Sequence, residues 1–153
     1  MKKIETFETH SAKETQKAGQ LLAKEIYSNK ISDSALIFCL NGDLGGGKTT
    51  FLQGFAKGLG IKEKILSPTF VILKRFSLFN KHYKNFYHID AYRIEDPKEM
   101  LLLGFKGILK DPKNIIAIEW AEKIKKILPK NCITLNFDVV KRDNRKISLK
   151  YYG

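Results

Sequence analysis

The sequence predicts an α/β protein: a three-layer sandwich whose mostly parallel central sheet lies between helices and ends in an antiparallel C-terminal hairpin. Three observations support this class. Apolar runs suited to buried strands alternate with segments of helical spacing, which is typical of a sheet covered by helices. A glycine-rich loop joins one such strand to a helix, and two strand-forming segments close the chain. We expect one domain over residues 1–153, because no linker or repeat interrupts a chain of this length.

The first part of the chain predicts an edge strand, a helix and a buried strand. Residues 3–7 suit a short edge strand. Ser11 and Glu14 have the spacing of a capping box, and apolar residues at helical spacing follow, so we expect a helix from about residue 12 to 28. The continuous apolar run at 35–40 predicts a strand buried on both faces.

A phosphate-binding pattern follows this strand. Residues 42–49 read GDLGGGKT and fit G-x-x-x-x-G-K-[ST], the loop of P-loop NTPases. Glycines let successive backbone N–H groups turn toward a phosphate, Lys48 reaches the terminal phosphates, and the Thr49 hydroxyl can hold Mg²⁺. A helix is expected to begin here and to end near residues 58–60. A glycine-rich surface turn would not explain a Lys-Thr pair directly after a buried strand.

The rest of the chain predicts further strands and two short helices. Asp96 and Pro97 predict the start of a helix that ends near Gly104, and 121–128 predicts a short basic helix ended by Pro129. Strands are expected at residues 70–76, 86–90, 115–120, 132–140 and 146–152, the last two joined by a turn at 141–145.

Two acids end predicted strands, where an α/β sheet places its ligand crevice. Glu119 and Asp90 are therefore candidates to hold Mg²⁺ and to place an attacking water, although each also suits a helix cap or a surface ion pair. Thr69, in a proline-containing turn, is a candidate sensor of the terminal phosphate or an ordinary turn threonine. Arg93 could form a structural ion pair, which is the favoured role, or stabilise transition-state charge or bind a partner. Trp120 suits the core, an interface or the site.

The composition restricts partners and compartment. The formal charge is +12, from 28 basic and 16 acidic residues, but scattered lysines dominate and only four arginines occur. This distribution disfavours direct reading of nucleic-acid bases, while a weak attraction to RNA or to an acidic protein surface remains expected. Cys39 and Cys132 lie in predicted strands and suit buried positions in a reducing compartment. No apolar run suits a membrane span or a signal peptide, so we expect a cytoplasmic protein.

Several functional classes fit a phosphate-binding loop. A GTPase needs N-K-x-D to read guanine, but residues 80–83 read NKHY, which excludes that motif. A small-molecule or nucleotide kinase stays open, although four dispersed arginines are few for a substrate lid. A small ATPase that acts on a partner, and a binding module whose hydrolysis is incidental, also stay open.

Four segments, in this order and spacing, resemble the TsaE family, the bacterial ATPases of tRNA threonylcarbamoyladenosine biosynthesis. They are GDLGGGKTT at 42–50, SPT at 67–69, HIDAYR at 88–93 and IEW at 118–120, and the similarity covers nearly the whole chain. Gly46 departs from the family, which usually has alanine there. The added backbone freedom is not expected to prevent phosphate binding.

The resemblance implies an activity, cofactors and partners. It implies that the chain binds ATP with Mg²⁺, hydrolyses it slowly alone, and acts with the TsaB–TsaD heterodimer, TsaD in particular, with tRNA contacted indirectly or weakly. We expect a monomer in isolation. The catalytic residues implied are Glu119, Asp90 and Thr69, and the metal ligands are Thr49, Glu119 and Asp90. The nucleotide-binding residues implied are Ser11, Thr15, Asp43, Leu44, Gly45, Gly46, Gly47, Lys48, Thr49, Thr50, Trp120 and Arg145.

Overall fold

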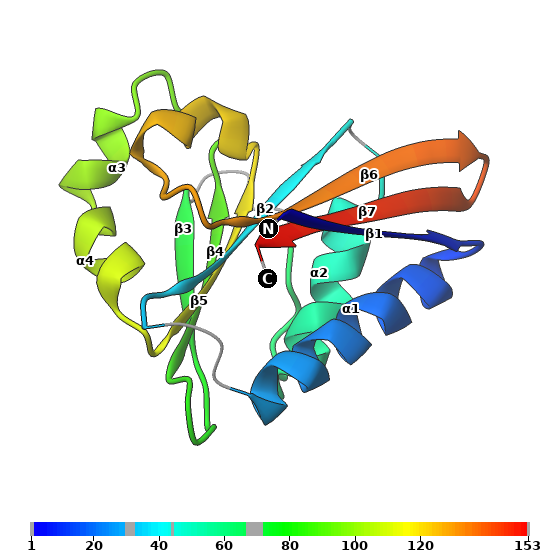
Figure 1. Cartoon of the computed structure of the whole chain (residues 1–153), viewed down its shortest axis with the longest axis horizontal. Coiled ribbons are helices and arrows are strands. Elements are labelled where there is room, and N and C mark those ends of the chain that lie inside the picture. The colour runs from blue at the N-terminus through cyan, green and yellow to red at the C-terminus, as the bar shows by residue number, and fades with distance from the viewer. Residues whose placement is uncertain (1, 30–32, 44, 67–71, 153) are drawn as a thin grey trace.

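The computed structural model describes residues 2–29, 33–43, 45–66 and 72–152. Within these ranges the chain forms one seven-stranded sheet in the order β1-β7-β6-β2-β5-β4-β3 (Figure 1). The strands are β1 (Lys2–Thr9), β2 (Leu36–Gly42), β3 (Leu73–Ser77), β4 (Asn85–Asp90), β5 (Asn114–Glu119), β6 (Ile133–Lys141) and β7 (Asn144–Tyr152). The helices are α1 (Ala12–Ser28), α2 (Lys48–Gly58), α3 (Lys98–Leu102), α4 (Phe105–Lys110) and the 3-10 helix η1 (Ala121–Ile127).

The centre of the sheet is parallel and its two sides are antiparallel. β2 runs parallel to β5 and β6, and β4 runs parallel to β5. β3 pairs antiparallel with β4, β6 with β7, and β7 with β1. Short connections between consecutive strands permit only antiparallel pairing, whereas parallel pairs need long crossovers. The predicted α/β class with a C-terminal hairpin is confirmed, in a sheet that is more mixed than expected.

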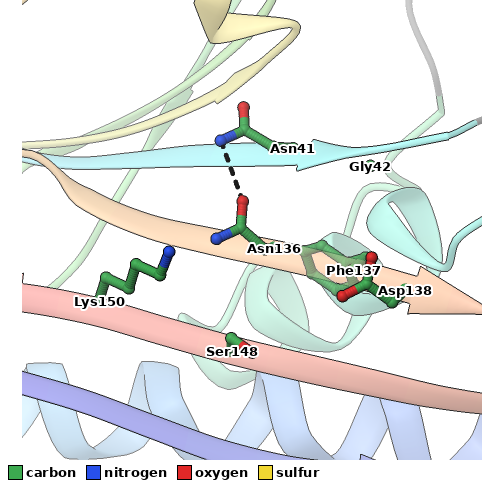
Figure 2. A pocket seen from close by; sticks show the side chains of 7 residues that line it. All are labelled: Asn41, Gly42, Asn136, Phe137, Asp138, Ser148 and Lys150. Atoms are coloured by element: carbon green, nitrogen blue, oxygen red, sulfur yellow. Dashed lines mark hydrogen bonds between the residues drawn. The ribbon is translucent and has the colours of Figure 1, made fainter.

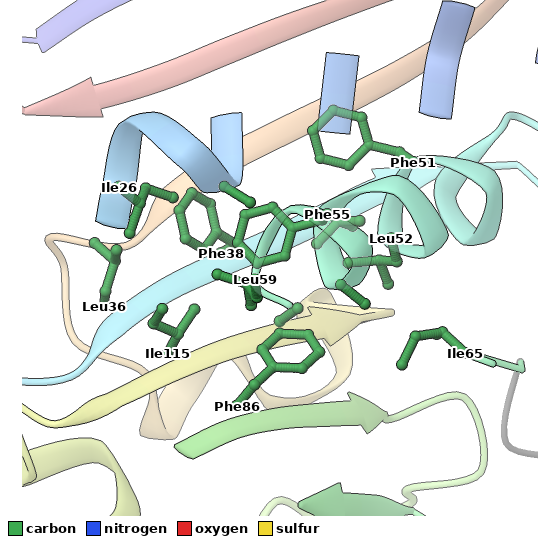
Figure 3. Packing of buried hydrophobic residues seen from close by; sticks show 14 of the residues in the cluster. Ile26, Leu36, Phe38, Phe51, Leu52, Phe55, Leu59, Ile65, Phe86 and Ile115 are labelled. Atoms are coloured by element: carbon green, nitrogen blue, oxygen red, sulfur yellow. The ribbon is translucent and has the colours of Figure 1, made fainter. Parts of the chain in front are cut away.

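Two apolar layers lie on opposite faces of the sheet, and β2 contributes to both. Leu36, Phe38 and Leu40 face α1 and α2, where Phe51 and Phe55 of α2 join the same core (Figure 3). The intervening residues of β2 belong to the second layer, together with residues of α3, α4 and η1. Alternate side chains of a strand point to opposite faces, so an uninterrupted apolar run is what a doubly covered strand requires.

Glycines allow helices α1 and α2 to pack backbone against backbone. A Cβ placed on Gly54 of α2 would lie 1.8 Å from the Gln16 carbonyl oxygen, and one on Gly58 would lie 2.5 Å from that of Gln20. On the facing helix, a Cβ on Gly19 would lie 2.1 Å from the Phe51 carbonyl oxygen. This close approach brings the first turns of both helices toward the same end of the sheet.

Three local expectations differ from the structure. A helix over Phe105–Lys110 was not expected, because Gly107 in its interior weakens the helical signal; Phe105, fully buried in the second layer, anchors it. Residues 121–127 form a 3-10 helix with a kink at Ile124, where an uninterrupted short helix was expected over 121–128. Cys132 lies one residue before β6 and is half-exposed, while Cys39 is buried in β2.

Within the described ranges, none of the helices combines the length and apolarity needed to cross a membrane.

Candidate functional site

The glycine-rich loop connects the carboxyl end of β2 to the start of α2. Gly45 and Gly47 have positive φ angles of 80° and 97°, which side chains other than glycine rarely adopt. Gly47 precedes α2, and no side chain caps the helix there. The first N–H groups of an α-helix have no partner within the helix, so this uncapped end is suited to an anion.

Lys48, the first residue of α2, is covered by Trp120. The Lys48 side chain donates a hydrogen bond from Nζ to the Gly42 carbonyl oxygen at 2.5 Å, and Nζ lies 4.5 Å from the centroid of the Trp120 ring. Trp120 follows β5 with φ at 59°, and its ring lies 5.1 Å from that of Tyr92, centroid to centroid. The predicted phosphate ligand is therefore only 6% exposed.

The two candidate acids are neighbours on adjacent parallel strands. Asp90 ends β4 and Glu119 ends β5, and the two residues are register partners. Burial raises the pKa of the Asp90 carboxyl above its ordinary value; the Tyr92 backbone N–H, which donates to it at 3.0 Å, opposes that rise, and the Glu119 charge adds to it. The Lys48 charge also lowers the Asp90 pKa. The structure thus brings Lys48, Asp90 and Glu119 together at one edge of the sheet.

His88 is a site residue to which no role was assigned from the sequence. It lies in β4, is 2% exposed, and its Nε2 lies 2.8 Å from Oε2 of Glu119. The signal that was available is periodicity, since a residue two positions before Asp90 on a strand shares its face.

The start of α1 and the C-terminal hairpin reach the loop from another side. Arg145 donates from Nη2 to the Gly45 carbonyl oxygen at 3.1 Å. Thr15 and Arg145 both have side-chain atoms within 4 Å of a Cβ placed on Gly47. Ser11 caps α1, and its Oγ accepts a hydrogen bond from the Glu14 backbone N–H at 3.1 Å. Both Thr15 and Arg145, predicted from the resemblance to lie at the nucleotide, therefore lie beside the loop.

The remaining predicted residues divide into three groups. Thr49 and Thr50 lie half-exposed in the first turn of α2. Asp43 is exposed, and its carbonyl oxygen accepts a hydrogen bond from the Gly46 backbone N–H at 3.0 Å. Leu44 and Thr69 lie outside the described residues.

The donor set fits a hard cation with few protein ligands. No group of three or more His, Cys, Asp or Glu side chains in the described ranges is arranged to hold a metal ion. Two neighbouring carboxylates and a threonine hydroxyl offer oxygen ligands to Mg²⁺, which usually combines one or two carboxylates with phosphates and water. The residues present therefore fit Mg²⁺ bound together with a phosphate.

A polar hollow of about 380 Å³ lies next to the loop and is distinct from this cluster (Figure 2). Asn41 donates from Nδ2 to Oδ1 of Asn136 at 3.2 Å across it. It is lined by Asn41, Gly42, Asn136, Phe137, Asp138, Ser148 and Lys150. Of these lining residues, only Gly42 also belongs to the phosphate-binding pattern of residues 42–49.

Comparison with known proteins gives one consistent result. The family model "Threonylcarbamoyl adenosine biosynthesis protein TsaE" matches residues 9–147. Curated TsaE proteins of Rickettsia typhi and Bacillus subtilis are 38% identical over 142 residues and 40% identical over 122 residues, covering 92% and 76% of this chain and 91% and 70% of theirs. The crystal structure of Bacillus subtilis YdiB matches with a TM-score of 0.71 at 28% identity, over 100% of this chain and 88% of that one. The chain belongs to the TsaE family of tRNA threonylcarbamoyladenosine biosynthesis proteins.

Proposed function

We propose that this protein binds ATP with Mg²⁺ at the loop of residues 42–49 and hydrolyses it. The observation that carries this proposal is the convergence of Lys48, Asp90 and Glu119 at the carboxyl edge of β2, β4 and β5. A phosphate-binding loop beside two acids is the arrangement that phosphoryl transfer to water requires. The guanine-reading motif of GTPases is absent from the sequence, which favours ATP.

Each residue has a defined part in this proposal. The backbone N–H groups of the loop and of the first turn of α2 bind the phosphates. Lys48 exchanges the Gly42 carbonyl oxygen for a phosphate oxygen, and Arg145 lies close enough to the loop to add charge. Thr49, Asp90 and Glu119 hold Mg²⁺, which neutralises charge on the phosphates when bound.

We further propose that Glu119 orients the attacking water, because its carboxylate is buried at the strand end and hydrogen-bonded in place. Thr69 stays a predicted sensor of the terminal phosphate, and Trp120 covers the site. The nucleotide is also expected to contact residues near Ser11 and Thr15.

In the pathway, we propose that the protein acts with the TsaB–TsaD heterodimer in the cytoplasm, with tRNA contacted weakly through the lysine-rich surface. Membership of the TsaE family supports this role. The choice of partners rests on the family resemblance, and not on an interface seen in this structure.

The decisive experiment measures ATP hydrolysis with and without the purified TsaB–TsaD pair. We expect low activity alone and a large stimulation by the pair. Glu119→Ala is expected to keep nucleotide affinity and to lose most hydrolysis, whereas Lys48→Ala is expected to weaken binding, because the phosphate loses a charge-assisted partner. Hydrolysis by Glu119→Ala at the wild-type rate would refute the catalytic assignment.

The same assay separates the alternatives. Labelled phosphate that appears on a small acceptor would favour a kinase over an ATPase. A hydrolysis-deficient variant that still supports tRNA modification over many turnovers would favour a nucleotide-dependent binding module.

A further inference from the structure

His88 occupies a buried position that apolar residues usually fill. Its side chain is 2% exposed, and the Glu119 residue that it contacts is 3% exposed. The distance of 2.8 Å between Nε2 of His88 and Oε2 of Glu119 lies within the range of a hydrogen bond. His88 and Glu119 are both among the buried polar and charged residues of the described ranges, and their hydrogen bond joins the neighbouring strands β4 and β5.

The strand register explains how the two side chains meet. β4 and β5 run parallel, with Asp90 opposite Glu119 and His88 opposite Ala117. Residues 88, 90, 117 and 119 point to one face, because side chains two positions apart share a face. Ala117 is buried and ends at its methyl group, so it leaves space for the imidazole to lean along the strand toward Glu119.

Stability alone does not account for such a pair. Removing two polar groups of this kind from water costs free energy that their attraction only partly returns, and well-packed apolar residues often stabilise a fold as well or better. A carboxylate that must act on a neighbouring atom, by contrast, benefits from a hydrogen bond that fixes its orientation. His88 occupies one acceptor site on Oε2 of Glu119, and the other acceptor sites of the carboxylate, including those on Oε1, have capacity for another partner.

We propose that His88 is a positioning residue: its Nε2–H holds Oε2 of Glu119, so that the carboxylate meets the nucleotide site in one orientation. This inference rests on the proposed function, in which Glu119 serves ATP hydrolysis. His88 itself contacts neither the nucleotide nor the attacking water, and it acts through Glu119. Because a carboxylate only accepts hydrogen bonds, the proton of the bond is on Nε2.

The test compares two replacements that separate ring volume from hydrogen bonding. His88→Phe keeps a ring and removes the donor, whereas His88→Gln removes the ring and keeps an N–H that can reach a carboxylate. His82→Phe is the matched control, because His82 lies in the connection between β3 and β4, at the end of β4 away from Asp90. Each variant is measured for kcat and KM with the TsaB–TsaD pair, for affinity toward a fluorescent ATP analogue, and for its urea unfolding midpoint.

For His88→Phe we expect kcat to fall about 10- to 100-fold, the range for losing a residue that orients a ligand, with analogue affinity changed less than about threefold. His88→Gln is expected to recover part of kcat, and His82→Phe to match the wild type. A kcat for His88→Phe within twofold of wild type would overturn the inference. A second result would also overturn it: His88→Phe and His88→Gln lose kcat equally, and both lose analogue affinity to the same extent. A purely structural role of His88 predicts that pattern.

A measurement that needs no turnover separates failure of this inference from failure of the proposed function. Long-range ¹H–¹⁵N spectra of the wild type are expected to show His88 protonated at Nε2, with signals that shift in Glu119→Gln. If that signature is present and no condition yields hydrolysis, the proposed function fails and the contact stands. If His88 is protonated only at Nδ1, the inference fails whatever the hydrolysis rate.

Discussion

The packing of α1 against α2 gives a sharp prediction at Gly54. A Cβ added there would lie 1.8 Å from the carbonyl oxygen of Gln16 and 2.5 Å from its carbonyl carbon. Both are backbone atoms, so no change of rotamer relieves the overlap. In Gly54→Ala the two helices must therefore move apart.

The size of the effect follows from the separation that is needed. Restoring an ordinary contact of roughly 3.5 Å from 1.8 Å requires the helices to separate by about 1.7 Å at this point, which weakens the contacts on either side of it. Overpacking of a core typically costs about 1–3 kcal/mol. The higher helix propensity of alanine returns at most about 1 kcal/mol. Because the obstruction is backbone, we expect a cost at the upper end of the range, and after the gain in helix propensity a net loss of about 2 kcal/mol.

Urea unfolding followed by circular dichroism measures this loss. Gly107→Ala in α4 is the matched control, because a Cβ at Gly107 meets no described atom within 4 Å and its φ is not in the positive region. We expect Gly107→Ala to gain about 0.5–1 kcal/mol through helix propensity alone. A loss below about 1 kcal/mol for Gly54→Ala, with the unfolding slope unchanged, would refute the backbone-to-backbone account. Because α1 carries Thr15 and α2 carries Lys48, Gly54→Ala is also expected to weaken nucleotide binding.

Two further predictions concern the site. The pKa of Asp90 is raised in the folded state by burial and by Glu119, so its contribution to the free energy of unfolding is most favourable when it is protonated and declines as pH rises from the ordinary carboxyl pKa through the folded value. Asp90→Asn is therefore expected to stabilise the protein relative to wild type at neutral pH and to lose that advantage on acidification. Thermal unfolding at several pH values measures the difference in stability. A stabilisation that grows toward low pH would contradict the assigned pKa shift. A Cβ on Gly46 would lie 3.0 Å from the Asp43 carbonyl oxygen and 3.6 Å from Cβ of Phe137, so Gly46→Ala needs an adjustment of only a few tenths of an ångström; we expect ATP-analogue affinity within about threefold of wild type by titration, and a loss beyond tenfold would show that the loop cannot adjust.

Local signals in the sequence predicted most elements, because those signals act over a few residues. The capping box at Ser11 predicted α1, which begins at Ala12, and the apolar run before the glycine loop predicted β2. α4 was missed because Phe105 is held by contacts with residues distant in the sequence. The 3-10 form of η1 was missed for a similar reason, since a kink at Ile124, buried in the second layer, interrupts the expected helix.

The candidate site was predicted in part. Lys48, Asp90 and Glu119 stand in motifs or at strand ends, so the sequence named them. The bond between His88 and Glu119 depends on the register of β4 against β5, which no local pattern specifies. The cover of Lys48 by Trp120 depends on the φ of 59° at Trp120, a backbone angle that its residue type does not predict.

Glycine spacing, helix capping and apolar periodicity are local properties of the chain, so the sequence alone predicted an α/β protein with a glycine-rich loop of the phosphate-binding pattern between a doubly buried strand and a helix. The order of the seven described strands, the close contact of α1 with α2 at Gly54, and the pairing of His88 with Glu119 follow from the folded structure alone. These features join segments tens of residues apart. Such contacts depend on how whole surfaces fit together, and that fit exists only once the chain has folded.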